Sequence, residues 1–327
     1  MKSSNIIRWG VIGCGAVTEI KSVPAYQKTK GFEVVAVMRR DFEKAKDYAQ
    51  RHGIPKVHPS AVDLIHDDGV DAVYIATPPD SHKTYALKVA EAGKPCCIEK
   101  PMAPSYEESL DIYKMFKVDN IPLFVSYYRR SLPRFLKINE WLNTHQIGKI
   151  RHIRWFLSKP PNPLDLSKNY NWRTDAKIAP GGYFDDLASH GLDLFTFLLG
   201  DIEFAQGVVN NQQGLYSAMD SVSANWLHKS GVMGSGSWNF GCDRREDKVE
   251  IYGSHGKITF SVFGEEDIVL ENGKGKQSLF IENPENVQLY HTKNIKEHLL
   301  GNQTHPSTGK TALHTSWVMN NILSETN

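Results

Sequence analysis

The chain has 327 residues, of which 40% are hydrophobic and 23% charged, and its formal net charge is +1. This composition indicates a soluble globular protein of about two domains, and the near-zero charge gives no general reason to expect nucleic acid or an anionic membrane as a partner. The N-terminal residues lack the apolar stretch of a signal peptide, and no apolar run approaches the roughly 20 residues of a membrane helix. We therefore expect a cytoplasmic protein.

The four cysteines give no sign of a disulfide framework or a metal site. They show neither a C-x-x-C pair nor a Cys/His spacing typical of zinc sites, and they are Cys14, Cys96, Cys97 and Cys242. We expect reduced, mostly buried thiols and no bound metal.

The first element is an apolar, β-branched run that predicts a strand at Ile6–Ile12. It ends at Gly13-Cys14-Gly15, and the residues that follow predict a helix at Ala16–Lys28. A strand, a glycine turn and a helix in this order are typical of a dinucleotide site. Gly13 would permit the tight turn, and Gly15 would let backbone amides approach a pyrophosphate.

Ala16 and Val17, which open this helix, are therefore assigned to the cofactor together with the two glycines. Thr18 occupies the third position of the fingerprint, where Gly or Ala is usual. This departure weakens the match to the motif.

Strands and helices alternate along the rest of the first half. The sequence predicts strands at Phe32–Met38, around Val57, and at Asp71–Ala76, Cys96–Glu99 and Ile121–Val125. It predicts helices at Phe42–His52 with Asp41 as N-cap, after the capping signals Ser60-x-x-Asp63 and Ser105-x-x-Glu108, and from Pro78 to about Gly93. This alternation predicts an α/β fold with a doubly wound, Rossmann-type parallel sheet, whose ligands bind at the carboxyl ends of the strands.

The residues after the second strand bear on the choice of cofactor. Arg39 and Arg40 stand where a carboxylate normally binds the adenosine ribose, and a guanidinium matches a 2′-phosphate. This favours NADP over NAD. The alternative is that Asp41 binds the ribose while both arginines are solvated.

Further cofactor contacts are predicted at the ends of later strands. Thr77 and Pro78 follow the strand Asp71–Ala76, and His82 opens the next helix, where capping is an equal alternative to a cofactor contact. Glu99 and Lys100 follow the next predicted strand, so Lys100 would face the crevice and could stabilise negative charge on a substrate oxygen.

The segment Gly181–Gly200 carries titratable groups on a largely apolar predicted helix. Asp186, His190 and Asp193 are four and three residues apart, which places them on one stripe of an α-helix. Buried ionisable groups must be paired or used in chemistry. Taken alone, this pattern favours a hydrogen-bonded core histidine with a carboxylate partner.

Two segments, Glu99-Lys100-Pro101 and Gly181-Gly182-x3-Asp186-x3-His190, resemble the Gfo/Idh/MocA family of glucose–fructose oxidoreductase and inositol dehydrogenase. The resemblance spans nearly the whole chain, through Gly13-x-Gly15, Asp71–His82, Ile147–Arg151, Trp172-Arg173, Gly181–Asp193 and Gly253–Phe260.

The resemblance implies an N-terminal Rossmann domain and a C-terminal α/β domain with an open, mainly antiparallel sheet that often forms oligomer contacts. It also implies that Lys100, Asp186 and His190 lie around the nicotinamide. We accordingly expect a homodimer or homotetramer formed through the C-terminal sheet. The domains would span residues 1–126 and 127–327, and the C-terminal helix could pack back on the first.

The second half of the chain is predicted to contain a helix, a strand and a loop, followed by a β-rich segment. A helix is predicted at Arg129–Leu142, a strand from Ile150, and a loop from Pro160 to Asn171. The β-rich runs after Phe204 predict an antiparallel meander with one helix-covered face, and helices close the chain at Val287–Leu300 and Thr308–Leu323.

We predict an NAD(P)-dependent oxidoreductase that acts on a secondary alcohol or ketone of a sugar, polyol or related carbohydrate. His190 would be the general base, Lys100 would stabilise the oxygen, and Asp186 would bind a neighbouring hydroxyl or orient the imidazole. The candidate substrate contacts beyond these three are Tyr127, Tyr128, Arg129, Trp172, Arg173 and Tyr183, with a place in the core as the alternative for the Tyr and Trp side chains.

Two alternatives remain open at this point. One is a glycoside hydrolase or lyase of the same fold that uses NAD for transient oxidation of the sugar. The other is a non-catalytic sensor of dinucleotides, against which the intact set of Lys100, Asp186 and His190 argues.

Overall fold

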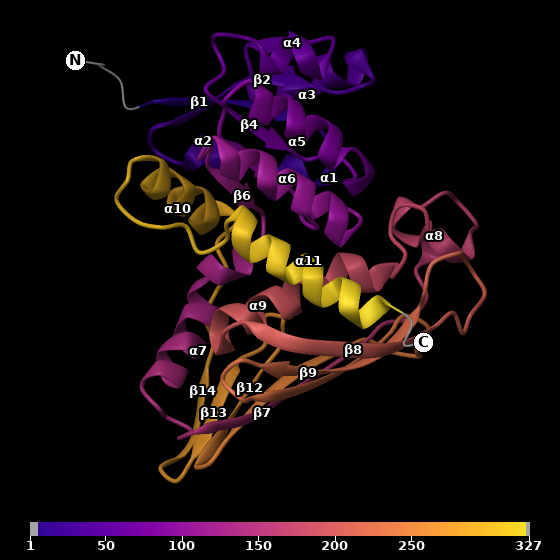
Figure 1. Cartoon of the computed structure of the whole chain (residues 1–327), viewed down its shortest axis with the longest axis vertical. Helices are drawn as coiled ribbons and strands as arrows, with labels where there is room; N and C mark the ends of the chain where they lie inside the picture. The colour runs from indigo at the N-terminus through magenta and orange to yellow at the C-terminus, as the bar shows by residue number, and fades with distance from the viewer. Residues whose placement is uncertain (1–5, 325–327) are drawn as a thin grey trace. The chain divides into compact units, whose positions relative to one another are not determined.

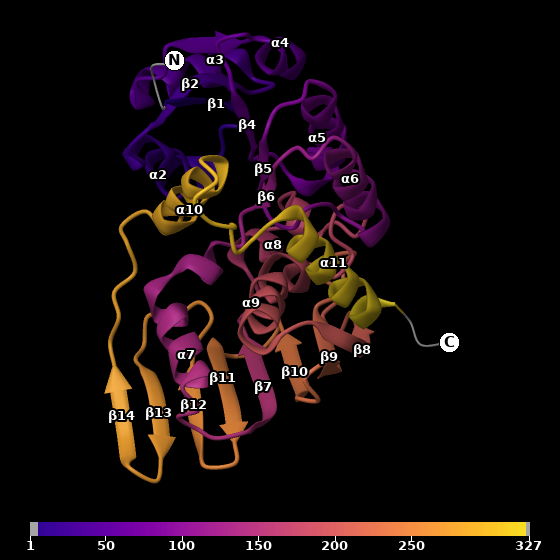
Figure 2. The same cartoon turned by 60° about the vertical axis from the view of Figure 1, so that its left-hand side comes forward.

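The computed structural model describes residues 6–324 and divides into two compact units (Figures 1 and 2). The first unit comprises the described residues up to Ser131 together with Pro284–Leu313. The second comprises Leu132–Asn283 and the described residues from His314 onward. The chain therefore leaves the first unit, builds the second, and returns to the first before it ends.

The first unit contains a six-stranded, all-parallel sheet in the order β3-β2-β1-β4-β5-β6. Its strands are β1 (Ile7–Ile12), β2 (Phe32–Met38), β3 (Lys56–His58), β4 (Ala72–Ile75), β5 (Cys96–Ile98) and β6 (Leu123–Val125). All five runs predicted after the first strand form strands of this sheet, and the predicted Rossmann fold is confirmed.

Helices connect these strands, and short polar side chains cap several of them. They are α1 (Ala16–Ile20), α2 (Val23–Lys28), α3 (Phe42–His52), α4 (Ala61–Ile65), α5 (His82–Glu91) and α6 (Tyr106–Val118). Asp41, Ser60 and Ser105 accept hydrogen bonds from backbone amides in the first turns of α3, α4 and α6. All three predicted N-caps are confirmed.

The prediction of a single helix at Ala16–Lys28 is wrong, because this segment forms two helices, α1 and α2, that are separated at Lys21-Ser22. Pro24 lies in the first turn of α2. A proline lacks an amide hydrogen and its ring crowds the preceding turn, so it is tolerated at a helix start and not in a helix interior. The proline thus sets the start of a new helix.

Both faces of the parallel sheet are buried. On one face the rings of Trp9 and Tyr26 meet edge to face with centroids 4.7 Å apart, and Phe32 lies 5.3 Å from Trp9. On the other face Leu64 and Val89 belong to a second apolar cluster. Burial on both faces explains the continuous apolar runs by which the sequence predicts these strands.

The returning segment Pro284–Leu313 packs on the first unit. Helix α10 (Leu289–Leu299) carries Thr292, whose hydroxyl lies 2.7 Å from that of Thr29 in a buried contact. Further along, Thr308 forms an antiparallel bridge with Phe124 of β6. Helix α11 (Gly309–Leu323) begins in the first unit and continues into the second.

The second unit contains an eight-stranded sheet in the order β14-β13-β12-β11-β7-β10-β9-β8 (Figure 2). Its strands are β7 (Ile150–Ser158), β8 (Ile202–Asn210), β9 (Ser221–His228), β10 (Met233–Asn239), β11 (Glu246–Gly253), β12 (Gly256–Phe260), β13 (Ile268–Asn272) and β14 (Gly275–Leu279). The predicted mainly antiparallel sheet is confirmed, with β7 and β10 as a parallel pair inside it.

One face of this sheet is covered by helices of the same unit. The ring of Trp155 in β7 meets Phe195 of α9 (Ser189–Leu199) edge to face at 5.5 Å, and Phe135 of α7 (Pro133–Asn143) lies 6.0 Å from Phe260. Gly191 of α9 leaves room for the Trp155 indole, which a methyl group there would overlap. The opposite face of the sheet carries alternate side chains that point away from this core.

Three local features from Tyr128 onward differ from the prediction. Residues 184–188 form a π-helical turn ahead of α9, so Gly181–Gly200 is not one α-helix. The predicted loop from Pro160 to Asn171 contains the short helix α8 (Pro163–Leu166), and the helix predicted at Arg129–Leu142 is divided into a 3-10 turn at Tyr128–Ser131 and α7.

None of the helices within residues 6–324 has the length and hydropathy needed to cross a bilayer.

Candidate functional site

A cavity of about 380 Å³ lies at the carboxyl ends of β1, β2 and β4 in the first unit. Six of the residues predicted to bind the cofactor line it: Gly13, Gly15, Arg39, Arg40, Thr77 and Pro78. It is also lined by residues that the motif does not identify: Cys14, Met38, Asp41, Ala76, Asp80, Ser81 and Tyr85. The cavity occupies the place where parallel α/β sheets bind ligands.

The two glycines meet two different geometric demands at this cavity. Gly13 has φ +97°, and a Cβ there would lie 2.9 Å from the backbone carbon and oxygen of Ala76. Gly15 opens onto space, because a Cβ there would meet nothing within 4 Å. A side chain at Gly15 would therefore project into the space that a pyrophosphate needs beside the first amides of α1, which have no intrahelical partners.

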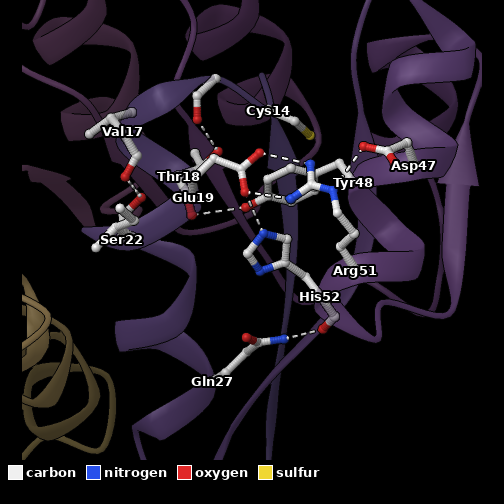
Figure 3. Close-up of polar contacts among 12 residues, drawn as sticks. Cys14, Val17, Thr18, Glu19, Ser22, Gln27, Asp47, Tyr48, Arg51 and His52 are labelled. Carbon is white, nitrogen blue, oxygen red and sulfur yellow. Dashed lines mark hydrogen bonds and ion pairs between the residues drawn. The ribbon is translucent and has the colours of Figure 1, made fainter.

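Thr18 replaces the usual third glycine without opening the turn. Its side chain is fully buried, and its hydroxyl donates to the carbonyl oxygen of Gly15 at 2.8 Å. The carbonyl of Thr18 in turn accepts a 2.9 Å hydrogen bond from the Tyr48 hydroxyl on α3 (Figure 3). In this chain the two hydrogen bonds made by Thr18 stabilise the glycine turn. A glycine at this position would instead allow close packing of the helix.

A charged cluster also links α1 to α3. Glu19 accepts two hydrogen bonds from the Arg51 guanidinium, at 2.7 and 2.8 Å, and its carboxylate lies 2.8 Å from Nε2 of His52 (Figure 3). The hydrogen bonds from Arg51 lower the pKa of Glu19 to about 2. Because these side chains are partly exposed, the cluster orients α1 more than it stabilises the fold.

The residues after β2 present positive charge to the cavity. Arg39 is half-buried and donates to the carbonyl of Cys14 at 2.7 Å, while Arg40 is exposed and forms no ion pair within residues 6–324. Asp41 caps α3 by accepting from the Lys44 amide at 3.1 Å, and its other oxygen lies 3.2 Å from the Lys44 ammonium. The hydrogen bond from the Lys44 amide lowers the pKa of Asp41, so this carboxylate already has partners on its own helix.

His82 lies under the cavity rather than in its wall. The ring is completely buried; Nε2 lies 2.8 Å from the carbonyl oxygen of Thr77 and Nδ1 lies 3.0 Å from that of Pro101. Burial lowers the pKa of the imidazole. His82 therefore ties the loop that lines the cavity to the loop that follows Lys100.

Lys100 follows β5 and is half-buried. The preceding residue, Glu99, has a carboxylate with several hydrogen-bond donors around it. Glu99 is 7% exposed and accepts hydrogen bonds from the Tyr74 hydroxyl at 2.5 Å and from Nε2 of Gln288 at 2.7 Å. The Lys100 amide donates to the other oxygen of Glu99 at 3.3 Å. Gln288 precedes α10 and contacts Glu99 across 189 residues of sequence, so no local pattern could have identified it.

Of the remaining predicted residues, neither Ala16 nor Val17 lines the cavity, although both lie in the first turn of α1 beside Gly15. Tyr128 is half-buried, with the Arg129 guanidinium 4.9 Å from its ring centroid. Tyr127 and Arg129 are buried, at 1% and 5% exposure.

In the second unit, Asp186 pairs with Arg173. The Arg173 Nε donates to Asp186 Oδ2 at 2.9 Å, and the guanidinium lies 4.3 Å from the ring centroid of Trp172. Three of the predicted substrate contacts thus adjoin one another. Asp186 belongs to the π-helical turn, a rare structure that is frequent at functional sites.

His190 and Asp193 lie one and two turns further on in α9. His190 is 5% exposed, and its ring meets Phe263 edge to face at 5.9 Å. Asp193 is fully buried and accepts a 3.0 Å hydrogen bond from the Thr315 hydroxyl of α11. Asp193 therefore ties two helices together inside the unit.

Two hydrogen bonds of its hydroxyl fix the position of Tyr183. The phenol donates to Asp165 at 2.5 Å and accepts from the Asn171 amide at 3.0 Å, so its polar end is engaged within the unit. The Lys159 ammonium lies 5.2 Å from the centroid of the ring. Asp165, Asn171 and Lys159 contact this predicted substrate residue, and the sequence motifs do not identify them.

Within residues 6–324, no group of three or more His, Cys, Asp and Glu side chains is arranged to hold a metal ion. The thiol of Cys14, although it lines the cavity, is 2% exposed, and burial raises its pKa to about 12. Nucleophilic chemistry by this thiol is therefore disfavoured, because the thiolate is the reactive form.

The comparisons with known proteins agree with this architecture. Residues 7–127 match an oxidoreductase family with an NAD-binding Rossmann fold, and residues 135–259 match the GFO/IDH/MocA C-terminal domain. The chain belongs to the Gfo/Idh/MocA oxidoreductase family. Its first unit is therefore a nucleotide-binding unit, and the prediction of an oxidoreductase is confirmed at the level of the family.

Relatives cover nearly the whole chain. An oxidoreductase of Formosa agariphila is 38% identical over 315 residues, which is 96% of this chain and 97% of that protein. Myo-inositol 2-dehydrogenase of Thermotoga maritima is 26% identical, over 82% of this chain and 79% of that protein. The structure of levoglucosan dehydrogenase in complex with NADH and levoglucosan shares the fold, with a TM-score of 0.85, 22% identity, and coverage of 97% and 96%.

Asp185, beside Asp186 in the π-helical turn, gives a pH-dependent prediction. Burial raises the pKa of this carboxyl to about 7, and its Oδ2 accepts from the Gly181 amide at 2.8 Å. Below about pH 4 both folded and unfolded chains hold this proton; between pH 4 and 7 only the folded chain does, so folding loses stability as pH rises. We expect Asp185→Asn to gain about 3 kcal/mol relative to the wild type between pH 5 and pH 8.

The measurement is the thermal or urea unfolding free energy of both proteins across this pH range. Asp243→Asn, at an exposed carboxyl of the same unit, serves as the control and should keep a constant difference from the wild type. A difference between Asp185→Asn and the wild type that does not change with pH would show that Asp185 is ionised in the folded protein.

Proposed function

We propose that this protein transfers a hydride between a nicotinamide cofactor and a secondary alcohol or ketone of a sugar, polyol or related carbohydrate. The observation that supports this most directly is the cavity at the strand ends, where Gly13 permits the turn and Gly15 leaves space for a pyrophosphate. The carbohydrate class is supported by relatives whose names specify inositol and levoglucosan.

The chain's own residues would manage the proton and the charge on the substrate oxygen. A bound nicotinamide accepts or supplies the hydride. His190 would take the hydroxyl proton during oxidation and return it during reduction, since an imidazole titrates near neutral pH. Lys100 would stabilise the negative charge that develops on the oxygen, and Asp186, oriented by Arg173, would bind an adjacent hydroxyl.

We propose NADP as the preferred cofactor. Asp41 already caps α3 and pairs with Lys44, so it is poorly placed to accept hydrogen bonds from ribose. Arg39 and Arg40 line the same end of the cavity, and the single hydrogen bond of Arg39 within the described chain holds it to Cys14. Two guanidinium groups there suit a 2′-phosphate.

A homo-oligomer formed through the outer face of the second unit's sheet accompanies this proposal. This face carries a depression of about 710 Å³ whose floor includes small side chains such as Ser223, Ser237 and Gly236. Large apolar side chains are exposed beside it, among them Val208 at 75% and Phe156 at 40%. Exposed apolar surface around a depression is typical of an interface.

The catalytic assignment is tested with Lys100→Met and His190→Ala. We expect each to lower turnover by about 100-fold or more, because proton transfer and charge stabilisation each contribute that much. The assay follows nicotinamide absorbance over a panel of sugars and polyols, with cofactor binding measured separately and Lys114→Met as an exposed-lysine control.

Near-normal turnover in both catalytic variants would refute the assigned roles. Sugar cleavage without net formation of reduced cofactor, in a protein that retains NAD through purification, would instead support the hydrolase or lyase alternative.

The cofactor preference is tested by titrating the protein with NADP and NAD. We expect NADP to bind at least about tenfold more tightly, and Arg40→Ala to remove most of this difference while leaving NAD binding unchanged. Lys46→Ala, at an exposed position of α3, is the control. A tenfold preference for NAD would contradict the role given to Arg39 and Arg40.

The oligomer is tested by light scattering on the wild type and Val208→Lys. We expect the wild type to have a mass of two or four times 36.9 kDa and the variant to dissociate, because burying an unpaired charge in an interface is costly. Val118→Lys, at a position 81% exposed in the first unit, should behave as the wild type. A wild-type mass of 36.9 kDa at micromolar concentration would rule out the interface.

A further inference from the structure

Lys159 stands at a fixed point of the second unit, directly after β7. Its amide donates to the Asn239 carbonyl at the end of β10 at 2.9 Å, and its carbonyl accepts from the Cys242 amide at 3.1 Å. The backbone is therefore held on both sides, in register with the end of the parallel β7–β10 pair. The Cα of Lys159 is therefore held in a fixed position, which limits where its ammonium can lie.

The side chain of Lys159 is half-buried and lies over an aromatic ring. Its ammonium is 5.2 Å from the centroid of Tyr183, whose hydroxyl is anchored to Asp165. In the part of the chain that the structure describes, no carboxylate comes within 4.0 Å of this ammonium. Burial lowers the pKa of Lys159.

The charged groups that surround Lys159 come from four elements. Asp186 of the π-helical turn and Asp165 of α8 attract the ammonium, whereas Arg173 and Arg245 repel it. Asp186 is paired with Arg173 at 2.9 Å. Asp186 is therefore already engaged by a guanidinium, and the ammonium of Lys159 lies over the ring of Tyr183 instead of in an ion pair with this carboxylate.

Resting on the proposed function, we propose that the substrate carries an anionic group, a carboxylate or a phosphate, and that this group binds the ammonium of Lys159. A structural lysine normally pairs with a carboxylate or extends fully into solvent, and Lys159 does neither. An anion would supply the missing negative charge, and a neutral hydroxyl would not. An ammonium acts as a compact point charge and accepts either a carboxylate or a phosphate.

This assignment gives two residues of the second unit different roles: Asp186 binds a hydroxyl of the substrate and Lys159 binds its anionic group. Asp186 is close enough to Lys159 to interact with it electrostatically, so the anionic group would bind beside the proposed hydroxyl-binding carboxylate. The same arrangement discriminates by charge, since binding a neutral analogue would leave the positive charge uncompensated. Lys159 is therefore a specificity-determining residue, and not a participant in proton transfer.

The experiment uses pairs of sugars that differ only in charge. Binding of D-glucose, D-glucuronate and D-glucose 6-phosphate, and of D-galactose and D-galacturonate, is measured by calorimetry with the full chain in the presence of NADP. Turnover of the same compounds is followed at the nicotinamide absorbance. The variants are Lys159→Met and Lys159→Arg, with Lys177→Met as an exposed lysine of the same unit, and the thermal stability of each is checked.

We expect at least one anionic sugar to bind about tenfold or more tightly than its neutral counterpart. Lys159→Met should abolish this preference through a higher Kd and KM for the anion, with values for the neutral sugars unchanged. Lys159→Arg should retain most of the preference, and Lys177→Met all of it. The uronate and phosphate arms identify which anion the site takes.

Three results would overturn the inference: equal binding of neutral and anionic sugars, no binding of any anionic sugar at millimolar concentration, or a uniform effect of Lys159→Met on all five compounds. Its failure is distinguishable from failure of the proposed function. Turnover of the sugars without any Lys159-dependent preference for an anionic one supports hydride transfer and refutes the anion site. Binding of an anion that depends on Lys159, without any reduction of nicotinamide, supports the anion site and refutes hydride transfer.

Discussion

The close approach of Gly13 to the end of β4 is the constraint on which the nucleotide-binding unit depends. The positive φ of Gly13 turns the chain at the end of β1, and the Ala76 backbone lies where a Cβ would have to be placed. The contact brings the loops after β1 and β4 together, and these two loops line one cavity with the residues after β2. A single residue without a side chain thus links the local turn to the candidate cofactor site. The turn is stabilised further by the hydrogen bonds of Thr18 and Tyr48 and by the ion pair that links Glu19 of α1 to α3.

The elements that the sequence predicts well are those decided by neighbouring residues. Asp41 and Ser60 cap helices because a short oxygen-bearing side chain satisfies amides two or three residues away. The strand β14 is different: Gly275–Leu279 is a polar segment that becomes a strand only because β13 offers an edge. The parallel pairing of β7 with β10 is likewise decided by the assembled sheet, and no periodicity in either strand specifies its direction.

The same distinction applies to the candidate site. Gly15, Arg40 and Thr77, which the glycine motif and the positions after strands assign to the cofactor, line one cavity. The contact of Gln288 with Glu99, the buried Asp185 and the position of Lys159 over Tyr183 depend on segments that meet only after folding. The π-helical turn changes the geometry around Asp186, which a uniform angle of 100° per residue could not anticipate.

The return of the chain through Pro284–Leu313 makes the nucleotide-binding unit discontinuous in sequence. Gln288 supplies one of the donors to the buried Glu99 carboxylate, and Thr308 bridges to the edge of β6. Each unit is therefore built from two segments of the chain, and Leu132–Asn283 lies between the two segments of the first unit. A fragment cut after Ser131 would lack one hydrogen-bond donor to the buried Glu99 carboxylate and the segment that bridges to β6, so residues up to Ser131 do not make up the whole first unit.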